Sequence, residues 1–142
     1  MRISEILRHK GTSVATVAPN TTVAELLAVL DEHNIGAVVV TEDDQVVGIV
    51  SERDVVRRLH DHGANLLSMP VCGIMTSEVV VCEVDDTVDE LAETMTERRV
   101  RHMPVMTDGR LAGIVSIGDV VKSRIRQLET DRSHLESYIA QG

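Results

Sequence analysis

The apolar positions of the chain repeat as two copies of one pattern. Gly48–Val56 reads Gly-Ile-Val-Ser-Glu-Arg-Asp-Val-Val, and Gly113–Val121 reads Gly-Ile-Val-Ser-Ile-Gly-Asp-Val-Val. The register between the copies is 65 residues, and it holds without a gap back to Thr16 and Val81. Each copy is small for independent stability, so we expect the two copies to pack together and share a core.

The spacing of the apolar residues predicts the order β-α-β-β-α in each copy. Val23, Leu26 and Leu30 follow a Thr22-x-x-Glu25 capping box at helical spacing, and β-branched runs indicate buried strands. The first copy is predicted to have strands at 14–17, 37–40 and 46–50, with helices at 22–33 and 52–60. The second copy is predicted to have strands at 79–82, 102–105 and 111–115, with helices starting at 87 and 117.

These elements divide the chain into five segments. They are an N-terminal helix within 1–13, a first repeat at 14–60, a linker at 61–78, a second repeat at 79–122 and a C-terminal helical extension at 123–142.

The two copies share a pattern but not a surface. Pro104 falls in a strand of the second copy, and proline has no N–H, so this strand is expected at a sheet edge or with that position unpaired. Gly118 stands where the first copy has Arg53, so the second copy has lost one cation.

The last helix is longer than the repeat requires, and it carries an apolar stripe that Arg132 interrupts. The stripe consists of Val121, Ile125, Leu128, Leu135 and Ile139. Two interpretations stay open: the stripe packs on a partner such as a second copy of the chain, or it folds back on its own chain.

Composition narrows the range of partners. The chain has 142 residues, a net charge of −9 and a pI of about 5.0, so no positive field draws a nucleic acid to it. Tyr138 is the only Phe, Tyr or Trp residue, so a purine would lie between aliphatic side chains and main chain.

Met1–Lys10 lacks a long apolar run, so we expect no signal peptide and no membrane span. Cys72 and Cys82 fit a reduced, cytoplasmic chain.

Ser51 and Asp54, like their counterparts Ser116 and Asp119, stand where a strand runs into a helix. Two interpretations of these residues stay open. In the first, Ser-x-x-Asp is a form of the capping box and only caps the helix. In the second, the free N–H groups of the helix start bind a phosphate, and the carboxylate accepts two hydrogen bonds from a ribose 2′,3′-diol.

The chain contains no motif typical of catalysis or metal binding. It has neither Gly-x-x-x-x-Gly-Lys-Ser/Thr nor Gly-x-Gly-x-x-Gly. Cys72 and Cys82 are ten residues apart, and no Cys-x-x-Cys or His-x-x-x-His occurs. We therefore expect no catalytic residues and no metal site.

The repeat resembles the CBS domain (the cystathionine β-synthase type of module), here as a tandem pair. The resemblance rests on Thr-Val-x-Glu-Leu at the first helix of each copy and on Gly-Ile-Val-Ser-x-x-Asp in both copies. Ile74–Thr76 and Arg101–Val105 add to it, and it covers residues 3 to 122. The Ser116–Lys122 run and the long last helix are similar to stand-alone bacterial two-CBS proteins.

The resemblance implies an α+β fold in which the two repeats pack through their sheets about a pseudo-twofold axis and leave two clefts. It implies a homodimer, because such pairs commonly dimerise. The family binds adenine nucleotides and adenosyl compounds, namely AMP, ADP, ATP and sometimes NAD or S-adenosylmethionine. It senses or regulates rather than catalyses, and the sequence does not name the protein that is regulated.

The resemblance also assigns roles to residues by position. Asp54 and Asp119 would bind ribose, and Ser51 and Ser116 would contact ribose or phosphate. The residues that would lie around the base are Thr16 and Val81 on one side, and Ala37, His102 and Pro104 on the other.

Basic residues near these positions are candidates for phosphate contacts, because a forked guanidinium suits phosphate. Arg53 and Arg101 are expected to take this role, with Arg57 one turn beyond Arg53. Arg98 and Arg99 are instead expected to be solvated residues at a helix end.

Three functions are compatible with these observations. The first is a regulatory module that binds an adenine nucleotide and changes the relation of its repeats. The second is a dimeric scaffold that needs no ligand, in which Asp54 and Asp119 only cap helices. The third is an enzyme such as a nucleotide hydrolase.

Overall fold

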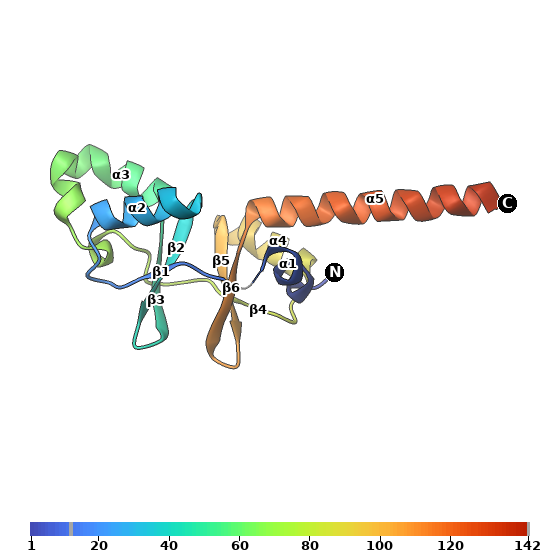
Figure 1. Cartoon of the computed structure of the whole chain (residues 1–142), viewed down its shortest axis with the longest axis horizontal. Coiled ribbons are helices and arrows are strands. Elements are labelled where there is room, and N and C mark those ends of the chain that lie inside the picture. The colour runs from blue at the N-terminus through green and yellow to red at the C-terminus, as the bar shows by residue number, and fades with distance from the viewer. Residues whose placement is uncertain (12, 142) are drawn as a thin grey trace.

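The computed structural model describes residues 1–11 and 13–141, which form two similar units side by side (Figure 1). Thr12, in the predicted N-terminal segment, and Gly142, in the predicted extension, lie outside the described residues. The elements are α1 (Ile3–Lys10), β1 (Thr16–Val17), α2 (Val23–His33), β2 (Ala37–Glu42), β3 (Gln45–Ser51), α3 (Glu52–His62), η1 (Gly63–Ser68), η2 (Val71–Gly73), β4 (Cys82–Glu83), α4 (Val88–Arg98), β5 (His102–Thr107), β6 (Arg110–Ser116) and α5 (Ile117–Gln141). Two three-stranded sheets with helices in this part of the chain confirm the predicted α+β fold.

Each sheet combines a parallel and an antiparallel pairing. β2 lies between β1 and β3 in the first sheet, and β5 lies between β4 and β6 in the second. Ala37 pairs with Ser51 and His102 pairs with Ser116, so the register is the same in both sheets. This register places each serine at the same sheet end as the first residue of the preceding strand. β3 contacts β6, and the two sheets meet there.

The predicted capping boxes are present at α2 and α4. The Thr22 hydroxyl accepts from the Glu25 N–H at 3.2 Å, and the Glu25 carboxylate accepts from the Thr22 N–H at 3.3 Å. Thr87 and Glu90 make the same two bonds at 3.1 and 3.3 Å. These bonds satisfy N–H groups that have no partner inside the helix, and they fix where each helix begins.

The segment that precedes each repeat covers the core of the other repeat. Ile3, Ile6 and Leu7 of α1 are buried in the core of the second repeat, where α1 contacts β6. Leu66 and Val71, from η1 and η2, are buried in the core of the first repeat. The expectation of one shared core is therefore wrong: the buried residues of the described chain form two clusters, and the exchange of covering segments ties the repeats together.

Pro104 changes the start of the second sheet. In the first sheet β1 begins with the pair Thr16–Val39, and the equivalent pair in the second sheet would be Val81–Pro104. That pair is missing, and β4 begins at Cys82, paired with Val105. β4 spans Cys82–Glu83 where a strand at 79–82 was predicted, just as β1 spans Thr16–Val17 where a strand at 14–17 was predicted, so both predictions begin too early. Pro104 lies in the central strand and not at a sheet edge, and its missing N–H accounts for the later start of the second strand by one more position.

The last helix, α5, begins at Ile117 as predicted and projects beyond the body of the molecule (Figure 1). Its predicted apolar stripe is between 50% and 67% exposed, so the described residues of this chain do not cover it. No helix among residues 1–11 and 13–141 has both the length and the apolar character to span a bilayer.

We expect Gly113→Ala to destabilise the protein, because α1 packs against β6 at this position. A Cβ at Gly113 would lie 2.6 Å from Cδ2 of Leu7, which is buried. Overpacking of this kind costs about 1–3 kcal/mol of unfolding free energy, measurable by urea denaturation. The control is Gly118→Ala, whose Cβ would have only an ordinary contact of 3.5 Å. Equal stability of the two variants would contradict the close packing of α1 on β6.

Candidate functional site

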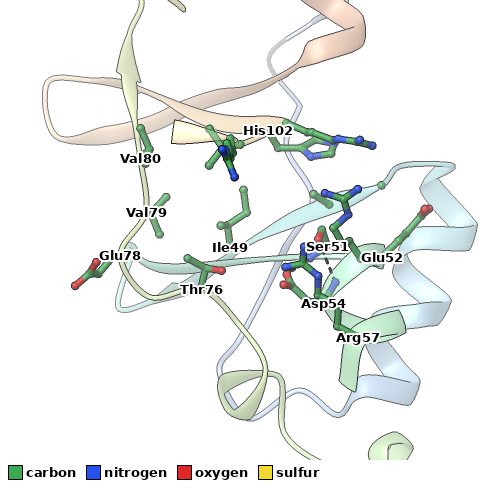
Figure 2. A pocket seen from close by; sticks show the side chains of 16 residues that line it. Ile49, Ser51, Glu52, Asp54, Arg57, Thr76, Glu78, Val79, Val80 and His102 are labelled. Atoms are coloured by element: carbon green, nitrogen blue, oxygen red, sulfur yellow. Dashed lines mark hydrogen bonds between the residues drawn. The ribbon is translucent and has the colours of Figure 1, made fainter. Parts of the chain in front are cut away.

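Two cavities open between the repeats in the described part of the chain. The first has a volume of about 280 Å³ and lies at the C-terminal end of β3 and the first turns of α3. Its opposite wall comes from the second repeat, through residues 78–80 and 99–102 (Figure 2). The second has a volume of about 490 Å³, and its walls include residues 13–15 and the ends of β5 and β6. Each cavity therefore lies between the hairpin of one repeat and the segment that leads into the first strand of the other repeat.

Ser51 and Asp54 hold each other at the floor of the first cavity. Asp54 Oδ2 accepts from the Ser51 N–H at 2.8 Å and from the Ser51 hydroxyl at 3.1 Å, and the Asp54 N–H donates back to Ser51 Oγ at 3.4 Å. The pair is a capping box at the start of α3. The carboxylate therefore caps the helix with Oδ2, and Oδ1 has no hydrogen-bond partner among the described residues.

Arginine side chains give the first cavity its cationic character. Arg53 and Arg57 come from α3, and Arg99 and Arg101 come from the turn between α4 and β5. In residues 1–11 and 13–141, none of these four guanidinium groups forms a salt bridge. Arg99 is exposed at the end of α4, where a solvated residue was expected, and it also borders the cavity. It is the C-cap of α4 in the left-handed conformation, with φ of 55°.

The second cavity has a different charge arrangement. Asp119 Oδ2 accepts from the Ser116 N–H at 2.8 Å and from the Ser116 hydroxyl at 3.0 Å, as in the first repeat. It also accepts from Lys10 Nζ at 2.7 Å. Burial raises the pKa of Asp119, but the bonds from Lys10 and Ser116 outweigh burial and hold that pKa below its ordinary value. The carboxylate is thus charged and already paired.

His102 lies between the cavities and lines both of them. Its ring packs close to Gly36, where an added Cβ would be 3.6 Å from Nε2. Burial lowers the pKa of His102, and Lys10 and Arg101 lower it further against the opposing effects of Asp119 and Glu52. His102 is therefore mainly neutral at neutral pH.

Other reactive groups do not assemble into a site. Burial, with Asp86 and Glu83 nearby, raises the pKa of the Cys82 thiol to about 12, so this thiol stays protonated. No group of three His, Cys, Asp or Glu side chains in the described ranges is arranged to hold a metal ion.

Comparison with known proteins identifies the repeat. The model of the CBS domain matches residues 3–61 and 71–126, which is most of the chain. The chain belongs to the CBS-domain family. The two matches correspond to the two repeats, so the chain holds a tandem CBS pair, as the sequence motifs predict.

Relatives and solved structures support this assignment along most of the chain. The chain is 32% identical to the mitochondrial CBS domain-containing protein CBSX3 of Arabidopsis thaliana, over 99% of this chain and 72% of the relative. It is 30% identical to CBS domain-containing protein YhcV of Bacillus subtilis, over 87% of each. The crystal structure of the CBS-domain containing protein ATU1752 from Agrobacterium tumefaciens matches with 47% identity and a TM-score of 0.85, over 87% of this chain and 99% of that one.

The structure brings most of the predicted CBS site residues to the clefts. Those that line the first cleft are Ala37, Ser51, Arg53, Asp54, Arg101 and His102. Those that line the second are Ala37, His102 and Ser116. Asp119 lies behind Ser116 and Lys10, outside the lining of the second cleft.

Three further predicted residues, in addition to Asp119, lie outside both CBS clefts. Thr16 is exposed in β1, Val81 is 44% exposed ahead of β4, and Pro104 is buried within β5. The residues that line the first cleft instead are Val79 and Val80, two positions and one position before Val81. The 65-residue register could have located them, because Val14 and Ala15 are their counterparts in the second cleft.

Other lining residues were not predicted as site residues. They are Gly36, Ile49, Glu52, Thr76 and Glu78 in the first cleft and Lys10, Ser13, His33, Asn34, Ile35 and Ile114 in the second. Ile49 and Ile114 occupy the same position of the shared Gly-Ile-Val-Ser motif, so the repeat itself marks them. Lys10 has no counterpart in the repeat pattern.

We expect the free energy of unfolding of His102→Gln to fall less than that of the wild type when the pH is lowered. The unfolded chain protonates His102 near its ordinary pKa of 6.5, whereas the folded CBS pair does so only at lower pH. Protonation therefore favours the unfolded state, and the free energy of unfolding decreases as the pH falls from 6.5 towards the lowered pKa. Glutamine does not titrate, so the variant lacks this decrease.

Urea denaturation between about pH 7.5 and pH 5 measures this effect, with His134→Gln on the exposed part of α5 as the control. The free energy of unfolding of His102→Gln should rise relative to that of the wild type as the pH falls. A difference that does not depend on pH would contradict the burial of His102 between the clefts.

Proposed function

We propose that the chain is a regulatory module that binds a phosphorylated adenine nucleotide in its first cleft and catalyses no reaction. The observation that carries this proposal is the position of Asp54, with one free carboxylate oxygen, beside four unpaired arginines of the described chain. A carboxylate next to several guanidinium groups matches a ribose diol next to phosphates.

Each part of the nucleotide has a partner in this arrangement. Asp54 Oδ1 accepts hydrogen bonds from the ribose hydroxyls, and Ser51 keeps the carboxylate in position. Arg53 and Arg57 bind phosphate together with the N-terminal N–H groups of α3. The adenine ring lies between aliphatic side chains such as Ile49 and Val80, because the chain has no Phe or Trp and its one Tyr lies on α5.

A related CBS pair supports an adenosyl ligand. The CBS domain pair of protein MJ0100 is 25% identical with a TM-score of 0.77, over 86% of this chain and 98% of that one, and its structure is a complex with 5′-methylthioadenosine and S-adenosylmethionine. The arginines of the present first cleft favour an anionic ligand instead of the cationic sulfonium of S-adenosylmethionine. We therefore favour AMP, ADP, ATP or NAD.

A thermal-shift panel with AMP, ADP, ATP, NAD, S-adenosylmethionine and GTP tests the proposal. Ligand at about 100 times its Kd adds about 2.7 kcal/mol, which raises Tm by roughly 9 °C at about 2.1 cal/mol/K per residue. We expect this rise with phosphorylated adenine compounds and not with GTP. A flat panel, from protein that carries no co-purified nucleotide, would favour the ligand-independent scaffold.

We expect Asp54→Asn to weaken nucleotide binding about 10- to 100-fold, the equivalent of one lost hydrogen bond to a charged group. The asparagine oxygen still accepts from the Ser51 N–H, so α3 stays capped. Calorimetric titration measures the effect, with Asp31→Asn on the exposed surface of α2 as the matched control. Unchanged affinity in Asp54→Asn would contradict the ribose role of this carboxylate.

We propose that the functional unit is a homodimer formed through exposed apolar residues of α3 and α5. Val56 and Leu59 on α3 are 68% and 49% exposed, and the α5 stripe residues are 50% to 67% exposed. Along α5 the stripe residues are spaced by four, three or seven positions, the a and d spacing of a coiled coil. A second copy of the chain offers the same stripe, and a regulated protein would then recognise the dimer.

We expect Leu128→Glu to raise the dimer Kd about 100-fold or more. Burying a leucine contributes about 1.5 kcal/mol or more, and a symmetric dimer loses two such contributions. Light scattering after size-exclusion chromatography, over a range of concentrations, measures the change. The control is Thr130→Glu, also exposed on α5 but off the stripe. An equal effect of the two substitutions, or a monomeric wild type, would contradict the proposed interface.

A further inference from the structure

Lys10 makes a long-range contact that has no counterpart in the first repeat. It is the last residue of α1, and its ammonium donates to the Ile114 carbonyl at 2.8 Å and to Asp119 Oδ2 at 2.7 Å. The Asp119 side chain is only 15% exposed. Lys10 therefore joins the end of β6 to the start of α5.

The first repeat satisfies the equivalent carbonyl in another way. Ile49 is the counterpart of Ile114, and its carbonyl accepts from the Thr76 N–H at 2.9 Å. No ammonium or guanidinium of the described chain forms a salt bridge with Asp54. Asp54 consequently lines the first cleft, whereas Lys10 lines the second cleft and Asp119 does not.

A short insertion explains why Lys10 reaches this position. Arg2 forms an isolated antiparallel β-bridge with Thr87, and Pro70 forms one with Thr22. Thr22 and Thr87 are equivalent in the repeat, so α1 and the segment after Pro70 are equivalent as well. Leu7 and Met75 then lie against the equivalent glycines of β6 and β3. Seven positions separate Leu7 from Val14, but only four separate Met75 from Val79. The three additional residues extend α1 and place Lys10 over Asp119.

We propose that Lys10 is a specificity-determining residue that prevents the second cleft from binding the ribose diol of an adenine nucleotide. This inference rests on the proposed function of the first cleft. Lys10 lines the second cleft and Asp119 does not, so the ammonium would have to move aside before a ribose hydroxyl could reach the carboxylate. Two hydrogen bonds hold the ammonium there, and the one to Asp119 is charge-assisted and stronger than a bond from a neutral hydroxyl. The chain therefore binds one nucleotide, in the first cleft.

The test is the number of nucleotides bound per chain, measured by calorimetric titration of the full chain with AMP and with ATP. We expect one in the wild type and two in Lys10→Met, with the additional site lost again in Lys10→Met/Asp119→Asn. Lys122→Met is the matched control, because Lys122 lies beside Lys10 and Asp119 but makes no bond to Asp119. Lys10→Arg keeps the cation and should keep one site. Lys10→Gln provides a second neutral variant in case Lys10→Met folds poorly.

The background Asp54→Ala separates this inference from the proposed function. In that background binding to the first cleft should be weakened at least as much as in Asp54→Asn, and Lys10→Met should give one tighter site that depends on Asp119. If neither neutral variant gains a site, or if the wild type already fills a site that depends on Asp119, the inference is wrong, whatever happens at the first cleft. If only the first-cleft site is missing and Lys10→Met still gains one, the proposed function of the first cleft is wrong and the role of Lys10 stands.

Discussion

The hydrogen bonds between serine and aspartate at the start of α3 and α5 hold both clefts in place. At α3 one oxygen of Asp54 accepts from the backbone and the hydroxyl of Ser51 at 2.8 and 3.1 Å. The carboxylate is thereby fixed by the fold before any ligand arrives, which lowers the entropic cost of binding. Helix capping and ligand binding are thus compatible roles of one side chain, because capping uses Oδ2 and our proposed ribose contact uses Oδ1.

A second constraint follows from the exchange of covering segments between the repeats. α1 packs on β6 at Gly113, and Met75 packs on β3 at Gly48, so each hairpin is closed by chain that belongs in sequence to the neighbouring repeat. The same crossing brings residues 78–80 to the first cleft and residues 13–15 to the second. Both clefts therefore lie at the boundary between the repeats, where a bound molecule contacts both.

The sequence predicted what local rules determine and missed what long-range contacts determine. Capping boxes and apolar spacing placed the helices and hairpins, because these depend on neighbouring residues. The pair expected at Val81 is missing because Pro104, its distant partner, has no N–H for the ladder. The resemblance named Thr16 and Val81, whereas the residues that line the clefts are the two that precede each of them. Lys10 could not be predicted, because its contact with Asp119 spans 109 positions and arises from an insertion outside the repeat.

The two repeats share one fold, but their residues at equivalent positions differ, and the two clefts therefore carry different charges. The first repeat has Arg53 and an aspartate without a cation, whereas the second has Gly118 and an aspartate bound by Lys10. A molecule in the first cleft would link α3 of one repeat to the turn at Arg99 of the other. A ligand shifts a conformational equilibrium only by its difference in affinity between two states. In this fold that difference would come from the fit of the arginines from both repeats around the same anion, so a change in the angle between the repeats alters binding directly.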